Sequence, residues 1–220
     1  MYVPKPYQVD EQWSKELIRR HPLAILMTNG PRVPFATHLP TIVPPDERAR
    51  LDTGEPLVGR TMFGHLNRLN PHWAALEPGG PAILVFQGPN SYVSPTVYEA
   101  TPAAPTWNFT SIHLHGTLRA IDDREVTLQI IRWTVEAFEA EFGANWDMRP
   151  SFGYFDNIVS GVGAFVFEIE AVDSMFKLSQ EQPAEVQERV VRSFAASDRC
   201  PHHRELAKLM RRINPAQDGG

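Results

Sequence analysis

Apolar and polar residues alternate along several short stretches of the chain. In GAFVFEIEAV, residues 163–172, Phe165, Phe167 and Ile169 face one way while Glu168 and Glu170 face the other. Such a period of two predicts a half-buried strand. Apolar runs bounded by Gly, Pro and Asn predict further strands at residues 23–28, 34–39, 61–66, 82–87 and 107–118. Asn29-Gly30 favours a hairpin turn between the first two.

Helical spacing of apolar residues appears in three other places. Residues 10–20 begin with Asp10 as a potential N-cap, and the longest predicted helix begins at Asp122, with Glu125 completing a capping box. Residues 183–212 are predicted to form two helices. Because no βαβ rhythm occurs, the pattern predicts an α+β fold with a small, mainly antiparallel β-barrel. We expect residues 1–182 to form the barrel domain, and residues 183–220 a helical extension packed on it.

Charge and cysteine content narrow the function classes. With 21 Lys and Arg against 26 Asp and Glu, the net charge of −5 makes nucleic acid an improbable partner. The single cysteine, Cys200, excludes an internal disulfide and Cys-rich metal sites. No leader-like N-terminus or membrane-length apolar run occurs, so we expect a cytoplasmic protein.

Histidines mark the most unusual segment, GHLNRLNPHW. Here a Gly-His pair, Gly64-His65, ends a predicted strand, and a histidine at that place can ligate a metal or haem iron. From spacing alone, a capping or core-edge histidine is the commoner explanation. His72, between Pro71 and Trp73, is interpreted as a surface or packing residue.

Three further segments carry polar groups. Residues 88–98 are rich in hydroxyls and too broken for regular structure, so they predict either a polar pocket lining or an ordinary loop. His113 and His115 share one face of a predicted strand, but no third ligand is near in sequence. Lys177 follows the strand predicted at residues 163–172. There its ammonium can bind a phosphate or carboxylate, or it can simply be exposed. The common catalytic signatures, such as GxSxG, the P-loop and HExxH, are absent.

Taken together, the segments MYVPKPY, HPLAILMTN with ATHLP, GHLNRLNPHW, FQGPNSYVSPTVY, PTWNFTSIHLHG and FKLSQ resemble the PaiB-like family of FMN-binding regulators over residues 1–182. The resemblance implies a split β-barrel and a homodimer. Within that family the chain is most similar to the piperazate synthases, a branch that binds haem b. In that branch the histidine that matches His65 is the axial haem ligand.

The resemblance implies a substrate and site residues. In the piperazate synthases that the chain resembles, N5-hydroxy-L-ornithine loses water as an N–N bond closes the ring of L-piperazic acid, and we expect the same substrate here. From charge and hydropathy we expect neither a membrane nor nucleic acid as a partner. Tyr98, His38 and Tyr92 are candidates for proton transfer. Trp107 is expected to flank the porphyrin. Candidates to contact a propionate or the substrate carboxylate are Asn108, Arg68 and Lys177.

Two alternatives stay open on the same barrel. One is an FMN-binding PaiB-like transcriptional regulator, and the other is a flavin oxidoreductase. The charge of −5 and the mixed-charge tail disfavour the regulator, whereas the fold cannot exclude the oxidoreductase.

Overall fold

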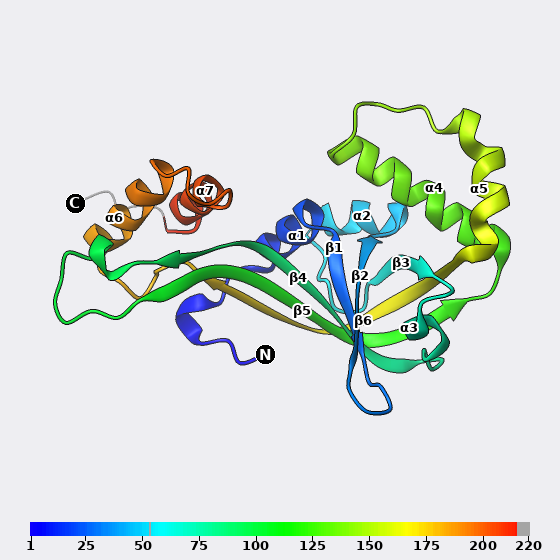
Figure 1. Ribbon diagram of the computed structural model, residues 1–220, viewed down its shortest axis with the longest axis horizontal. Helices are drawn as coiled ribbons and strands as arrows, with labels where there is room; N and C mark the ends of the chain where they lie inside the picture. Colours follow the sequence, from blue (N-terminus) through cyan, green and yellow to red (C-terminus); the bar gives the residue numbers. More distant parts are fainter. Residues whose placement is uncertain (53, 215–220) are drawn as a thin grey trace. The chain divides into compact units, whose positions relative to one another are not determined.

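A six-stranded antiparallel ring forms the centre of the computed structural model, which describes residues 1–52 and 54–214. Within that part of the chain the strand order is β1-β2-β3-β6-β5-β4 (Figure 1). This confirms the predicted α+β split barrel. The strands are β1 (Leu23–Thr28), β2 (Phe35–Ile42), β3 (Thr61–Asn67), β4 (Gly80–Val93), β5 (Thr106–Ile121) and β6 (Val162–Lys177).

Helices flank the strands and fill the connections. The α-helices are α1 (Glu11–Arg20), α2 (Pro45–Asp52), α3 (Pro71–Ala74), α4 (Arg124–Glu141), α5 (Phe152–Ile158), α6 (Ala184–Ala195) and α7 (His203–Ile213). Short 3₁₀ turns are η1 (Lys5–Tyr7), η2 (Pro95–Val97), η3 (Arg149–Ser151) and η4 (Val159–Gly161). None of the helices in residues 1–52 and 54–214 is long and apolar enough to cross a membrane.

Several predicted boundaries differ from the structure, among them β2 and β5, which extend to Ile42 and Ile121. Residues 88–93 continue β4, because Pro89, Ser91 and Val93 alternate towards the buried side. Residues 175–177 are the end of β6 and do not follow it. Helix α4 is capped by Asp123, whose carboxylate accepts the Val126 N–H at 2.9 Å, so the predicted cap at Asp122 is one residue early.

Strand register separates an inner from an outer face of the ring. Gly64 pairs with Thr41 on one side and with Phe165 on the other. Because side chains alternate along a strand, the neighbours of Gly64 point to the opposite face. The inner face is apolar and almost fully buried, and it includes Leu26, Leu39, Met62, Leu84, Phe165 and Phe167.

Gly64 is required by close packing inside the ring. A Cβ atom at this position would lie 2.4 Å from the Phe165 ring, so any other residue would force that ring to shift. The phenyl ring therefore occupies the inner side of β3 at this point. His65, the next residue, projects from the outer face.

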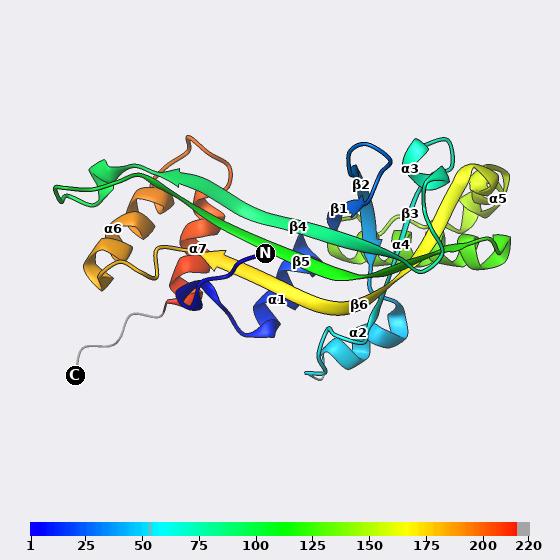
Figure 2. The ribbon, with the colours of Figure 1, turned by 90° about the horizontal axis from the view of Figure 1, so that it is seen from below.

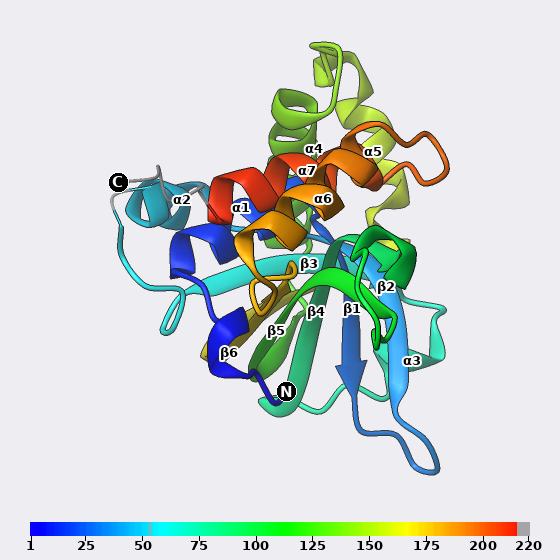
Figure 3. The same cartoon turned by 90° about the vertical axis from the view of Figure 1, so that its left-hand side faces the viewer.

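Two compact units make up the chain. The barrel unit contains residues 11–86 and 112–172, with the pairings of β1, β2 and β3 and helices α1 to α5. The extension unit contains residues 1–10, 87–111 and those from 173 onward, with the remaining ends of β4, β5 and β6 (Figure 2). In it, α6 and α7 lie side by side (Figure 3). The predicted domain boundary at residue 182 stays a prediction.

Candidate functional site

His65 is the predicted site residue that carries a buried nitrogen without a hydrogen-bond partner in the described part of the chain. It lies on β3 opposite Ala164 of β6 and shares the outer face with Phe63. Phe63 stacks on Trp133 of α4, with ring centroids 5.8 Å apart. Nδ1 of His65 is buried and has no hydrogen-bond partner within residues 1–52 and 54–214. Burial lowers the pKa of His65, because the charged ring loses its hydration.

A buried imidazole nitrogen without a partner is costly to the fold. The lowered pKa keeps the His65 ring neutral, so a nitrogen lone pair is available for a metal ion or for a hydrogen-bond donor. Haem iron accepts such a nitrogen as an axial ligand. His65 therefore offers a neutral imidazole nitrogen, the kind of ligand that haem iron accepts, and it equally offers one polar contact to a flavin.

His72 differs from His65 in the partners of its ring nitrogens. It is fully buried, its Nε2 contacts Thr28 Oγ1 and its Nδ1 contacts Thr37 Oγ1, both at 2.9 Å. Its ring stacks on Phe35 with centroids 5.1 Å apart. Both nitrogens are occupied, so His72 is a packing residue, as the sequence suggested.

Arg68 and His38 are the other predicted residues of the barrel unit. Arg68 donates from Nε to the Val162 carbonyl at 2.9 Å, and its guanidinium lies 5.0 Å from the centroid of the Trp73 ring. These contacts fix the arginine where β3 ends. His38 is exposed on β2, and the register places it on the same outer face as His65.

Aromatic residues gather in the extension unit. Tyr92 and Trp107 meet edge to face at 6.2 Å, and each is about half exposed, at 47% and 53%. Tyr98 is buried, and its carbonyl oxygen accepts from Arg189 Nη2 at 2.6 Å. Burial first, and then the negative charges of Glu181 and of ionised Tyr92, raise the pKa of the Tyr98 phenol. Tyr98 therefore keeps its proton and can act as a donor.

Lys177 lies among groups that the sequence analysis missed. Its ammonium donates to Thr106 Oγ1 and lies 5.8 Å from the centroid of the Tyr7 ring. The Tyr7 hydroxyl donates to Glu181, and burial together with that carboxylate raises the pKa of Tyr7. The only signal in the sequence was that Tyr7 ends MYVPKPY and that Glu181 directly follows FKLSQ, two of the segments that carry the resemblance.

Asn108 is fully buried in the extension unit. Its Nδ2 donates to Ser179 Oγ at 3.0 Å, and Ser179 Oγ donates back to Oδ1 at 3.1 Å. This reciprocal pair ties β5 to the segment after β6. A contact of Asn108 with a cofactor stays a prediction.

Other histidines do not assemble a metal centre. His113 and His115 lie on β5 with ring centroids 6.3 Å apart. No group of three or more metal-ligating side chains was found in residues 1–52 and 54–214. Any metal at His65 would thus need most of its ligands from a prosthetic group.

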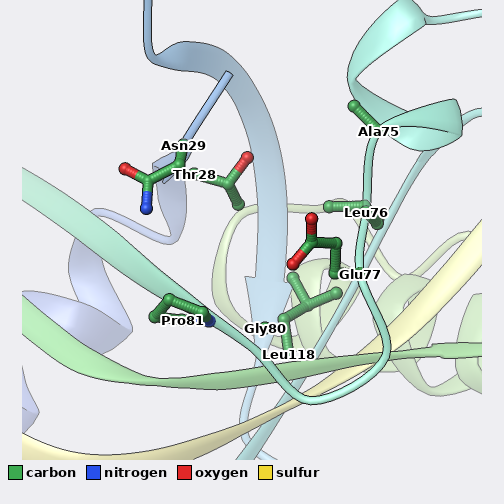
Figure 4. A pocket seen from close by; sticks show the side chains of 8 residues that line it. All are labelled: Thr28, Asn29, Ala75, Leu76, Glu77, Gly80, Pro81 and Leu118. Carbon is green, nitrogen blue, oxygen red and sulfur yellow. The ribbon is translucent and has the colours of Figure 1, made fainter. Parts of the chain in front are cut away.

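A separate small cavity lies in the barrel unit, with a volume of ≈ 160 Å³ (Figure 4). Glu77 points into it towards Thr28, and Asn29, Leu76 and Leu118 form other walls. None of the predicted site residues lines this cavity. Thr28 links its wall to the buried His72.

Known proteins resemble the chain in sequence and in fold. Residues 1–171 match the family described as “Putative FMN-binding domain”. The chain is 24% identical over 215 residues to “Protease synthase and sporulation protein PAI 2” of Bacillus subtilis, covering 96% of each sequence.

Solved structures share the fold. A conserved hypothetical protein from Mycobacterium tuberculosis matches with a TM-score of 0.55 and 10% identity, covering 83% of this chain and 94% of that one. The FAD and haem binding protein from Mycobacterium smegmatis matches with a TM-score of 0.54 and 14% identity, covering 84% of this chain and 79% of that one.

Proposed function

We propose a haem-dependent enzymatic function for this chain, which belongs to the “Putative FMN-binding domain” family. His65 would hold the iron of haem b, and the reaction would convert N5-hydroxy-L-ornithine into L-piperazic acid. The observation that supports this proposal is the buried Nδ1 of His65 without a partner. A protein of the same fold is named for binding both FAD and haem, so the fold is compatible with either cofactor.

The proposed reaction is redox-neutral. The N5–O bond breaks, a bond forms between the α-nitrogen and N5, and the hydroxyl leaves as water with a proton from the amine. When bound, haem iron supplies a Lewis acid that polarises the N–O bond. The site must also hold the substrate curled, with its two nitrogens near contact.

Side chains of this chain are proposed to handle the protons. Tyr98 retains its proton because its pKa is raised, so it can donate to the departing hydroxyl. His38, an exposed imidazole, can accept the proton that the amine loses, and Tyr92 can orient the substrate. Trp107 is proposed to flank the porphyrin on the ground of the resemblance alone.

A homodimer is proposed from the outer face of the barrel unit. The register of β1 with β2 and β4 places Ile25, Met27, Ile83 and Val85 on this face, all half-buried. Leu23, on the same face, is 61% exposed. A contiguous apolar sheet face of this kind is typical of a protein–protein contact. We expect a second copy of the chain to cover this face. Separately, we propose a reducing, cytoplasmic setting for the protein.

FMN binding is the second candidate. It is favoured by the family match and by the relative in Bacillus subtilis, and it would make the chain a flavin-dependent regulator or oxidoreductase. The net charge of −5 argues against DNA as the ligand.

Incubation of the haem-loaded protein with N5-hydroxy-L-ornithine tests the proposed reaction. We expect mass spectrometry to detect a cyclic product lighter by one water, and we expect His65→Ala to form none. Absence of the product from fully haem-loaded wild-type protein would refute the cyclase assignment.

A further inference from the structure

One positive and one negative side chain of the extension unit contact the same tyrosine. The Tyr7 hydroxyl donates to Glu181, and the ammonium of Lys177 lies 5.8 Å from the centroid of the Tyr7 ring. Tyr7 ends η1, which lies beside the carboxy-terminal end of β6 (Figures 1 and 2). Lys177 is the last residue of β6, and Glu181 follows four residues later. Two segments far apart in sequence therefore build one charged site.

Neither charge is neutralised by an ion pair within residues 1–52 and 54–214. The hydrogen-bond partner of Lys177 is the Thr106 hydroxyl, and Glu181 accepts from Tyr7 and, at 3.5 Å, from Gln182. All of these partners are uncharged. Within the described residues, neither the Lys177 amine nor the Glu181 carboxyl group therefore has a side chain of opposite charge as its partner, and a ligand can supply one.

Aromatic rings adjoin the two charges. Tyr98 lies close enough to Glu181 for the carboxylate to raise the pKa of the Tyr98 phenol, and the ring centroids of Tyr92 and Trp107 lie 6.2 Å apart. Rings of this kind attract an ammonium group to their faces and pack against aliphatic carbon. The surroundings of Glu181 and Lys177 therefore suit an organic ligand that carries both charges on a short carbon chain.

A zwitterionic α-amino acid has this charge pattern. Its ammonium needs an anionic acceptor and its carboxylate needs a cationic donor, each bound by charge-assisted hydrogen bonds. We propose that Glu181, oriented by Tyr7, binds the α-ammonium of the substrate and that Lys177 binds its α-carboxylate. The identity of the substrate as an amino acid rests on the proposed function above.

Three small ligands separate the two roles. L-Norvaline carries the amino-acid head on the substrate's carbon chain, pentanoate lacks the amine, and butylamine lacks the carboxylate. None contains a hydroxylamine, so none can be turned over. Their binding to the full-length, haem-loaded protein is measured by calorimetry or by competition against N5-hydroxy-L-ornithine.

We expect Glu181→Gln to weaken binding of L-norvaline and butylamine on the order of tenfold, with pentanoate unchanged, because one charge-assisted contact is lost. Lys177→Gln should show the converse, with L-norvaline and pentanoate weakened and butylamine unchanged. Tyr7→Phe, which removes the hydroxyl that holds Glu181, should follow the Glu181 pattern with a smaller loss. Glu185→Gln, an exposed acid in the first turn of α6, is the control with the same change of charge.

Equal losses for all three ligands in Glu181→Gln, or a loss no greater than in Glu185→Gln, would overturn the assignment. So would wild-type protein that binds none of the ligands. Failure of the cyclase proposal is seen separately, as full haem loading and intact norvaline binding without a cyclic product.

Discussion

Two histidines seven residues apart, His65 and His72, respond alike to burial but differ in their hydrogen-bond partners. Both have a lowered pKa because burial disfavours the charged ring. His72 has hydroxyl partners on both nitrogens, whereas the buried Nδ1 of His65 has none in the part of the chain that is described. His65 and His72 therefore differ in the partners of their ring nitrogens and not in the effect of burial.

Replacing His72 tests its packing role. We expect His72→Ala to lower the free energy of unfolding by about 2–4 kcal/mol, because a cavity forms and two threonine hydroxyls lose their partner. Chemical denaturation measures this change. His38→Ala, at an exposed position of the neighbouring β2, should change stability by less than about 0.5 kcal/mol. Equal effects of the two substitutions would contradict the assignment.

The pH dependence of stability follows from the same residue. The folded pKa of His72 lies below its unfolded value of about 6.5, so the unfolded chain binds more protons as the pH falls. His72 therefore stabilises fully above pH 6.5 and progressively less below it. We expect the wild-type melting temperature to fall from pH 7.5 to pH 5.5, and to fall less steeply in His72→Phe. An identical slope in the two proteins would count against a buried, neutral His72.

Sequence reasoning could select His65 but not the groups around Lys177. GHLNRLNPHW is one contiguous segment, so its resemblance to the family points directly to His65. Tyr7 and Glu181 lie at opposite ends of the chain and become neighbours only when η1 packs beside the end of β6. No local pattern could have paired them.

Strand prediction succeeded for a short apolar run with clear boundaries, and it stopped too early where the alternation of buried and exposed positions fades. Residues 23–28 were predicted as the structure has them, whereas β6 extends to Lys177 through residues 172–175 that are half-buried on both faces. A strand without a solvent face shows no period of two. Helix α2 was not predicted, because its sequence, PDERARLD, carries no apolar stripe.

Gly64 sets the geometry of β3, and its replacement tests this packing. A Cβ at residue 64 would collide with the Phe165 ring, so we expect Gly64→Ala to cost about 1–3 kcal/mol of unfolding free energy. Differential scanning calorimetry should show the loss. Phe165→Leu in the same chain should recover part of it, because it removes the obstructing ring. Gly153→Ala, where a Cβ meets nothing within 4 Å, is the control. A stable Gly64→Ala protein would show that β3 is not held by this contact.

At the scale of the whole molecule, the apolar part of the outer face formed by β1 and β4 predicts a dimer. Ile25 and Val85 are partners on β1 and β4 of this face. We expect the protein to be a dimer by light scattering, and Ile25→Asp to shift it to a monomer by burying a charge at the contact. Arg119→Asp introduces the same side chain at an exposed position of β5 and should leave the dimer intact. A wild-type monomer would remove the basis for this interface.

Neither sequence patterning nor fold distinguishes haem from flavin as the cofactor. A solved protein of the same fold is described as binding FAD and haem, and the family of this chain is named for FMN. Cofactor identity depends on a few side chains at one site, of which His65 offers the clearest chemistry.

Visible absorption of the purified, haem-reconstituted protein tests ligation by His65 most directly. We predict a Soret band in the wild-type protein and in His38→Ala, and its loss in His65→Ala. A yellow flavoprotein spectrum that is unchanged by His65→Ala would contradict haem ligation and favour the flavin alternative.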